Sequence, residues 1–346
     1  MDKNYKPRGT FDKKFLSELK IYNWIVDYAH SHQSGLDIKV RGNYLNVYYN
    51  GGNLMKLEGK DKIFFSEYYF YLPQKGGLAS SDIQRLIKSN DNIDKSGFLR
   101  NKKRQELAKL RKNACEIHER LKSERDALVN QLKYSNTFDE VVSYIEKMKR
   151  QMDKWKGRKG NAKNERSIQQ YISLYNQSFD EGTDYIVLDV EYALPYNAVY
   201  FNKESYGSSC HPRLDIIAVD KSGQIYVMEL KYGLKSVGGK SSISDHLKDF
   251  NNTVGHPDKW KAFVEDVKVL FDYQKGHGLI DHEAVIDITK KPVFMLVLKE
   301  EKNGDRENFI KEMRFHNIPD NVQAIFLPKD NSKVDYPECN YKLKKV

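Results

Sequence analysis

The sequence is poor in cysteine and has no long apolar run. Its three cysteines lie far apart and form no CxxC pair, which argues against a zinc knuckle or an iron–sulfur cluster and suits a reducing cytoplasm. No run of about 18 uncharged apolar residues occurs, and the start, MDKNYKPRGTFDKK, lacks an apolar stretch, so neither a transmembrane helix nor a signal peptide is expected. No GxxxxGK[ST] motif is present either, so no P-loop motor or switch is predicted.

Positive charge is in excess over negative charge. The 346 residues carry a formal net charge of +10, which favours a polyanionic partner, most simply nucleic acid. A Lys-rich solvated surface is the alternative. The hydrophobic fraction of 39% is sufficient for a packed core, and the length suits two domains.

Residues 1–97 have the pattern of a compact α+β module. Apolar residues recur at helical spacing from residue 11 to about 31, which predicts a helix. The next segment, LDIKVRGNYLNVYYNGGNLMKLEG, alternates short apolar runs with turn residues and predicts an antiparallel meander, to which FFSEYYFYLP adds a strand. We expect this module to recognise the substrate or a partner.

Residues 98–156 have the pattern of a helical connector. The segment 99–133 has no Gly or Pro and contains a broken apolar seam, and FDEVVSYIEKMKRQMDKW predicts a second helix. The seam either packs on its own chain or makes the protein a homo-oligomer through residues 99–155. The basic, glycine-punctuated stretch 154–166 is typical of a domain boundary.

Residues 157–346 change to an α/β pattern in the order helix, three strands, helix, two strands. The helical pattern SIQQYISLYNQSF comes first, and the tail SKVDYPECNYKLKKV is polar, so a surface position is expected for it. Two helical patterns, SSISDHLKDFNNTV and PDKWKAFVEDVKVLFDYQKG, follow the third strand. The predicted strands are DYIVLDVEYAL, RLDIIAVD, QIYVMEL, PVFMLVL and NVQAIFL.

Two of these strands carry charged residues at one end, where apolar residues would pack better. The turn at 220–223 folds QIYVMELK back on RLDIIAVD, so Asp215 is expected beside Glu229, and Lys231 shares a face with Glu229. Two close carboxylates repel unless a cation joins them, and Mg²⁺ prefers such oxygen ligands. The pattern predicts a Mg²⁺ site, which Mn²⁺ can also fill, with Lys231 placed to orient water or stabilise a phosphoryl transition state.

Asp215, thirteen intervening residues and then Glu229-Leu230-Lys231 resemble the D-x(n)-[DE]xK signature of the PD-(D/E)xK nuclease superfamily. The order of elements from about 163 to 300 is also similar to its core, so the resemblance covers the C-terminal half. It implies a restriction-endonuclease-like core and a Mg²⁺-dependent phosphodiesterase, with Asp215 and Glu229 as metal ligands and Lys231 as the third catalytic residue. The family's proline is replaced by Leu214.

Further candidates surround this motif. Many family members add a glutamate on the helix before the first strand, a place that Glu165 takes; the alternative is a charge that suits the helix dipole. One of Asp189 and Glu191 in the first strand is a candidate extra ligand; the alternative is that they face solvent or cap a basic neighbour. Arg213 is placed either to reach a phosphate or in a surface role. His246 stands where one branch of the superfamily has the Gln of a QxxxY helix, and it is a candidate for contact with the substrate. The basic residues expected to follow a nucleic-acid backbone are Lys154, Lys156, Arg158 and Lys159.

The ExK pattern occurs four times, so alone it carries little weight. The copy at 300–302 is a rival to the one at 229–231, because Asp287 precedes Glu300 by 13 positions, but it leads directly into Asn303-Gly304. Only the copy at 229–231 has a hairpin partner that bears an aspartate. The alternative for that copy is a surface salt-bridge cluster.

Together these features predict a cytoplasmic, metal-dependent endonuclease that acts on DNA, of the kind found in bacterial restriction or anti-phage defence. The alternative function is a catalytically silent nucleic-acid-binding protein that keeps the nuclease fold. Such a protein would bind without metal, with a steep salt dependence, and would cut nothing.

Overall fold

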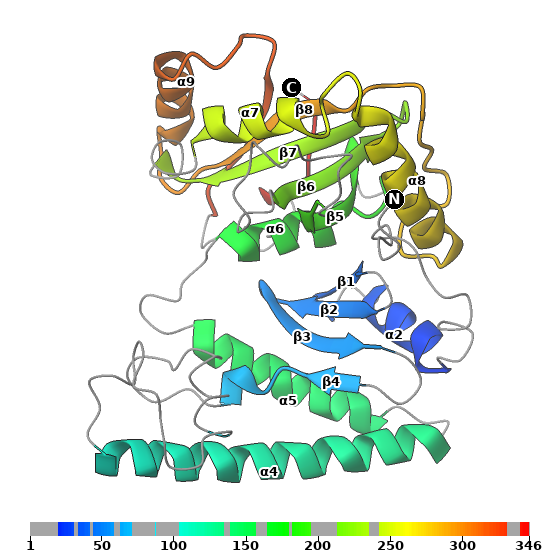
Figure 1. Ribbon diagram of the computed structural model, residues 1–346, viewed down its shortest axis with the longest axis vertical. Helices are drawn as coiled ribbons and strands as arrows, with labels where there is room; N and C mark the ends of the chain where they lie inside the picture. Colours follow the sequence, from blue (N-terminus) through cyan, green and yellow to red (C-terminus); the bar gives the residue numbers. More distant parts are fainter. Residues whose placement is uncertain are drawn as a thin grey trace. The chain divides into compact units, whose positions relative to one another are not determined.

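The computed structural model describes twelve parts of the chain: residues 20–30, 34–41, 44–58, 63–70, 87, 104–134, 139–156, 165–179, 182–194, 213–234, 242–330 and 340–345. These residues form a mixed α/β structure with two β-sheets and seven α-helices (Figure 1). The chain divides into two compact units: unit 1 is built mainly from Ile25–Gly51 and Lys163–Val346, and unit 2 from Gly52–Ala162. The three-part division expected at residues 97 and 156 stays a prediction.

Unit 1 is built around a five-stranded sheet with the order β5-β6-β7-β8-β9. β5, β6 and β7 pair antiparallel, whereas β7, β8 and β9 pair parallel. Apolar residues fill the centres of the strands, so the middle of the sheet is buried on both faces. The strands are Tyr185–Ala193, Arg213–Asp220, Ile225–Tyr232, Val293–Lys299 and Gln323–Leu327.

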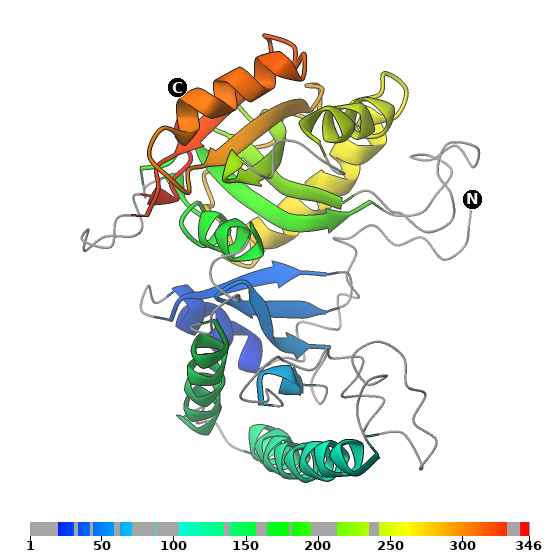
Figure 2. The ribbon, with the colours of Figure 1, turned by 90° about the vertical axis from the view of Figure 1, so that its left-hand side faces the viewer.

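Helices cover both faces of this sheet (Figures 1 and 2). Ile168 and Ile172 of α6 join a core that includes Met295 of β8. Phe294 alternates with Met295 and therefore points to the opposite face, where its ring lies 5.4 Å from that of Phe250 in α7. The sheet is thus packed between α6 and the later helices. The bounds of these helices are α6 (Glu165–Leu174), α7 (Ile243–Asn252) and α8 (Trp260–Gly276).

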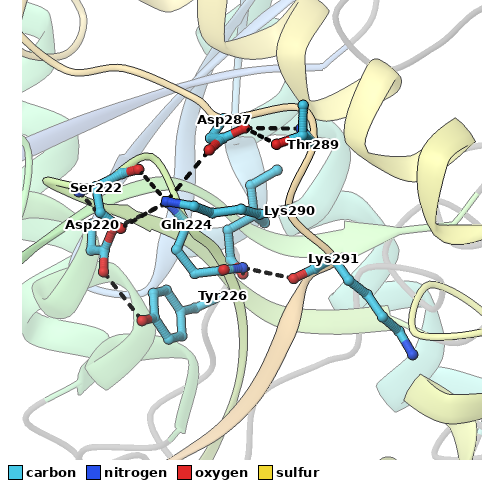
Figure 3. A network of polar contacts seen from close by, with 9 residues as sticks. Asp220, Ser222, Gln224, Tyr226, Asp287, Thr289, Lys290 and Lys291 are labelled. Atoms are coloured by element: carbon cyan, nitrogen blue, oxygen red, sulfur yellow. Dashed lines mark hydrogen bonds and ion pairs between the residues drawn. The ribbon is translucent and has the colours of Figure 1, made fainter.

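The β6–β7 turn is held by a polar network (Figure 3). The Asp220 carboxylate accepts hydrogen bonds from the backbone N–H of Ser222 at 2.9 Å and from its hydroxyl at 2.7 Å. Lys290 donates to the Ser222 carbonyl at 2.8 Å. Gly223 has φ +77°, and a Cβ there would lie 2.6 Å from the Asp287 nitrogen, so the turn requires glycine. These contacts fix the hairpin at one end of the sheet.

An N-terminal hairpin belongs to unit 1 and covers α6. β1 (Leu36–Val40) pairs antiparallel with β2 (Leu45–Tyr49), as the meander pattern predicts, and every residue of β1 is buried. Gly51 has φ +75°, and a Cβ there would lie 2.5 Å from the Ser167 hydroxyl. Its N–H donates to the Gln170 side chain. Because the hairpin sits against it, α6 buries polar as well as apolar side chains. α2 (Lys20–His30) precedes β1.

Unit 2 contains the two longest described helices. Ala114, Leu121 and Leu128 of α4 are buried, and Lys147 of α5 donates to Glu124 of α4 at 2.7 Å. The apolar seam of α4 is therefore used within the chain, and a homo-oligomer through residues 99–155 stays a prediction. The elements of this unit are β3 (Gly52–Leu57), β4 (Ile63–Phe65), the 3₁₀-helix η1 (Glu67–Phe70), α4 (Arg104–Tyr134) and α5 (Asp139–Lys156).

Two segments differ from the sequence prediction. The expected strand FFSEYYFYLP ends after β4 at Phe65, and the chain then turns into η1. Between β8 and β9 the chain forms α9 (Asp305–Phe315), which the predicted order of two consecutive strands lacks. Only Asp305 and Phe309 of α9 are buried, so its apolar period is too weak to signal a helix.

The C-terminal residues 340–345 are not the polar surface segment that the sequence predicts. Tyr341 and Leu343 are 1% and 0% exposed. The Leu343 backbone N–H donates to the Asn176 side chain at 2.8 Å, and its carbonyl accepts from the Asp184 N–H at 2.9 Å. The segment therefore closes the core beneath α6 and β5, although most of its residues are polar.

Leu343→Ala is expected to lower the free energy of unfolding by about 2–4 kcal/mol, because it leaves a cavity in this core. Urea denaturation followed by circular dichroism measures the change. Lys344→Ala is the matched control, since this neighbouring side chain is exposed, and its effect should stay within about 0.5 kcal/mol. Equal effects of the two substitutions would show that the segment contributes nothing to the core.

Candidate active site

The β6–β7 hairpin places Asp215 and Glu229 at the same level on neighbouring strands. Ile216 pairs with Met228, so the residues next to this pair, Asp215 and Glu229, lie opposite each other. Opposite residues on antiparallel strands point to one face, with Cβ atoms about 5 Å apart. Both carboxylates lie at the end of the hairpin away from the turn, in the arrangement that the sequence predicts.

Lys231 completes the motif. Its Nζ donates to Glu229 Oε1 at 2.6 Å, and both side chains are about 5% exposed. Asp215 is held from the neighbouring strand, where the Leu230 backbone N–H donates to its Oδ2 at 3.0 Å. The three side chains are therefore fixed by β-strands rather than by loops, which suits precise chemistry.

The two carboxylates lie where negative charge is costly. Burial and the nearby Glu165 raise the pKa of Asp215 from its ordinary 3.8 to about 7, against the opposing effects of the Leu230 N–H and of Lys231. Burial and Asp215 raise the pKa of Glu229 well above its ordinary value, although Lys231 bonds to it. The positive groups of the protein do not compensate this charge, so a divalent cation would relieve the repulsion.

Glu165 and His246 join the cluster from two helices. Glu165 opens α6; burial raises its pKa, and the Lys231 charge acts in the opposite direction. His246 lies on α7, and its Nε2 is 3.0 Å from Glu229 Oε1. Burial and Lys231 lower the pKa of His246 to about 4, so the imidazole is neutral at pH 7. Both candidates thus lie beside the ExK motif.

α7 is anchored just before His246. Ser242 and Asp245 form a capping box, in which each side chain bonds the backbone of the other. Since the cap fixes the first turn of the helix, it also fixes the direction in which the next side chain, His246, leaves it.

The candidate nucleic-acid-binding residues lie in different places. Arg213 is mostly exposed and bonds Glu191 at 3.3 Å. Lys154 is exposed on α5, and Lys156 is the last residue of that helix. Arg158 and Lys159 lie outside the described residues.

The rival copy of the motif at 300–302 does not have Asp287 beside it; the aspartate that contacts it is Asp305 of α9, whose carboxylate accepts from the backbone N–H groups of Glu301 and Lys302. Asp287 lies at the β6–β7 turn, where its backbone N–H donates to the Gly223 carbonyl and its side chain bonds Thr289 (Figure 3). Glu300 follows the far end of β8. A whole strand therefore separates Asp287 from Glu300, whereas the copy at 229–231 lies beside Asp215.

Asp189 does not join the site. It is 0% exposed and binds the guanidinium of Arg41, which follows β1. Arg41 also donates to the Val190 carbonyl at 2.8 Å. The sequence analysis did not identify Arg41. Its only sequence signal is an arginine directly after the strand LDIKV, and this position alone does not specify a partner 148 residues away.

The described residues contain no group of three or more His, Cys, Asp or Glu side chains arranged to hold a metal ion as they stand. A Mg²⁺ ion needs only one or two protein carboxylates, because water and a phosphate oxygen supply its other ligands. The uncompensated charge of Asp215 and Glu229 fits such an ion.

Comparison with family models, with curated proteins and with solved structures gave no match. Within the described residues, no helix combines the length and the apolar character needed to cross a membrane.

Proposed function

We propose that the protein is a metal-dependent nuclease of the PD-(D/E)xK type that hydrolyses phosphodiester bonds, most simply of DNA. The observation that carries the proposal is the placement of Asp215 and Glu229 next to the Ile216–Met228 pair of the β6–β7 hairpin, with Asp215 bonded to the Leu230 N–H and Lys231 bonded to Glu229. The order of α6, three antiparallel strands, helices and a parallel strand supports the same proposal, because it is the order that the resemblance implies.

Asp215 and Glu229 would hold Mg²⁺ or Mn²⁺ through their carboxylate oxygens. When bound, this ion supplies positive charge to the phosphate and promotes the ionisation of water. Lys231 is held at Glu229 by a 2.6 Å hydrogen bond, from which its ammonium can turn toward the attacking water or the phosphate oxygens, where negative charge develops. His246 contacts the same Glu229 oxygen and restricts its orientation.

Charge supports nucleic acid as the substrate. The chain has a net charge of +10, and the exposed Arg213 lies two residues from Asp215 on the strand that carries it. Lys154, Lys156, Arg158 and Lys159 are further candidates for backbone contacts. A cytoplasmic role in bacterial restriction or anti-phage defence follows from the resemblance and belongs to the same proposal.

Cleavage of supercoiled plasmid, linear duplex, single-stranded DNA and RNA tests this proposal. Glu229→Ala and Lys231→Ala should each lower metal-dependent cleavage by about 10²–10³-fold or more, because the first removes a carboxylate ligand of the metal and the second removes positive charge near the reacting phosphate. Reactions in Mg²⁺, Mn²⁺ and EDTA show the metal dependence, and the substrate panel identifies the nucleic acid.

The chain supplies its own matched controls. Glu300→Ala and Lys302→Ala alter the ExK copy that is not paired with Asp287 across strands, and both should cut like the wild type. If the wild type binds nucleic acid with a steep salt dependence and cuts none of the substrates, the silent-binder alternative replaces the nuclease proposal.

A further inference from the structure

Three neighbouring strands carry a carboxylate at the same level. On β5, Glu191 lies opposite Asp215 of β6, which lies opposite Glu229 of β7. Like charges directly opposite each other destabilise a sheet, so a row of three calls for a compensating ligand. The row is placed by the paired residues beside it, which are Val190, Ile216 and Met228.

The backbone of Glu191 has a conformation that non-glycine residues seldom adopt. Its φ is +53°, in the left-handed region, and the β5–β6 register shifts between Val187 and Asp189, just before it. Irregularities of this kind re-aim side chains, and they cluster near functional sites. A regular strand conformation at Glu191 would have a lower backbone energy.

Arg41 braces the strand on one side of Glu191. Its guanidinium is buried, bonds Asp189 and donates to the Val190 carbonyl at 2.8 Å. It also donates to the Val40 carbonyl at 3.1 Å, so the end of β1 is tied to the irregular part of β5. The strained conformation is therefore supported by contacts outside the strand.

Glu191 is also electrostatically part of the cluster. After burial, its charge is a further cause of the raised pKa of Glu165, and a smaller one for Asp215. Its own carboxylate accepts from Arg213 at 3.3 Å. When all four carboxylates are ionised, their charge exceeds that of Lys231 and Arg213, which bond to Glu229 and Glu191, so a divalent cation would offset the excess.

We propose that Glu191 is a fourth acidic residue of the active site, which strengthens divalent-cation binding by its charge and through the cation's water ligands. Arg41 acts as its positioning residue. This inference rests on the proposed function, because it assumes that Asp215 and Glu229 bind the cation.

Calorimetric titration of the full chain with Mn²⁺, without nucleic acid, tests the inference. Glu191→Gln should weaken Mn²⁺ binding about three- to tenfold, as expected for the loss of one nearby charge. Glu265→Gln is the matched control on the exposed face of α8 and should bind like the wild type. Thermal unfolding in EDTA should show Glu191→Gln to be at least as stable as the wild type, which excludes misfolding as the cause.

The outcomes separate the two proposals. If the wild type binds Mn²⁺ and Asp215→Asn does not, but Glu191→Gln binds within twofold of the wild type, the role of Glu191 is overturned and the nuclease proposal stands. If the wild type binds no Mn²⁺ at this site, both are overturned.

A double-mutant cycle tests the role of Arg41. Arg41→Lys should weaken Mn²⁺ binding several-fold in the wild type and have little further effect in the Glu191→Gln background. Equal losses in both backgrounds would show that Arg41 does not act through Glu191.

Discussion

Asp215→Asn is expected to abolish metal-dependent cleavage and, in the same protein, to stabilise the metal-free fold. The loss of activity should reach about 10³-fold, because an amide oxygen is a much weaker ligand for Mg²⁺ than a carboxylate. The gain in stability has a different cause. Asp215 lies beside Glu165 and Glu229, and the neutral amide removes this repulsion while its oxygen can still accept from Leu230.

The gain should depend on pH. The pKa of Asp215 is about 7 in the folded chain and 3.8 as its ordinary value, so the folded state holds a proton that the unfolded state has lost between these values. Wild-type stability should therefore fall as pH rises from about 4 to 7. At pH 8 the variant should be more stable by ~1–2 kcal/mol, a figure reduced for partial solvent exposure. At pH 4 the two should be equal.

Urea denaturation in EDTA at pH 4, 6 and 8 measures this difference. Asp258→Asn is the control, since this side chain is 89% exposed and lies away from the cluster. A variant less stable than the wild type at pH 8 would show that Asp215 serves the fold and not a cation site.

The sequence was sufficient to predict the part of the site that lies on one hairpin. Strand alternation, a short polar turn and thirteen intervening residues predict that Asp215 lies beside Glu229, because a tight turn at 220–223 sets this register. This hairpin relation is local, so it follows from periodicity. Glu165 was expected at the site only because the resemblance implies a glutamate on the helix before the first strand.

Contacts between distant segments could not be predicted in this way. Arg41 meets Asp189, and Leu343 meets Asn176, across separations that no pattern within either segment reveals. The left-handed conformation of Glu191 has no sequence signature either, because non-glycine residues with positive φ are set by their surroundings. Likewise, Tyr341 and Leu343 enter the core through contacts with distant segments, which the polar composition of the tail does not reveal.

The largest expected loss of stability comes from Arg41→Met. Arg41 is 7% exposed and Asp189 is fully buried, so the substitution leaves a buried carboxylate without its cation. Removing one partner of such a pair costs about 3–5 kcal/mol. Replacing both, in Arg41→Met/Asp189→Leu, should recover much of this loss, because an apolar pair has no charge to desolvate.

Urea denaturation of the full chain, followed by circular dichroism, compares these variants with Lys268→Met. That control breaks an exposed pair with Asp272 on α8 and should cost less than about 1 kcal/mol. If Arg41→Met costs no more than the control, the buried pair does not hold β1 to β5. If the predicted loss occurs, the hairpin of β1 and β2 is an integral part of unit 1. A chain lacking residues 25–51 would then expose α6 and leave Asp189 uncompensated, so the C-terminal half alone should not fold stably.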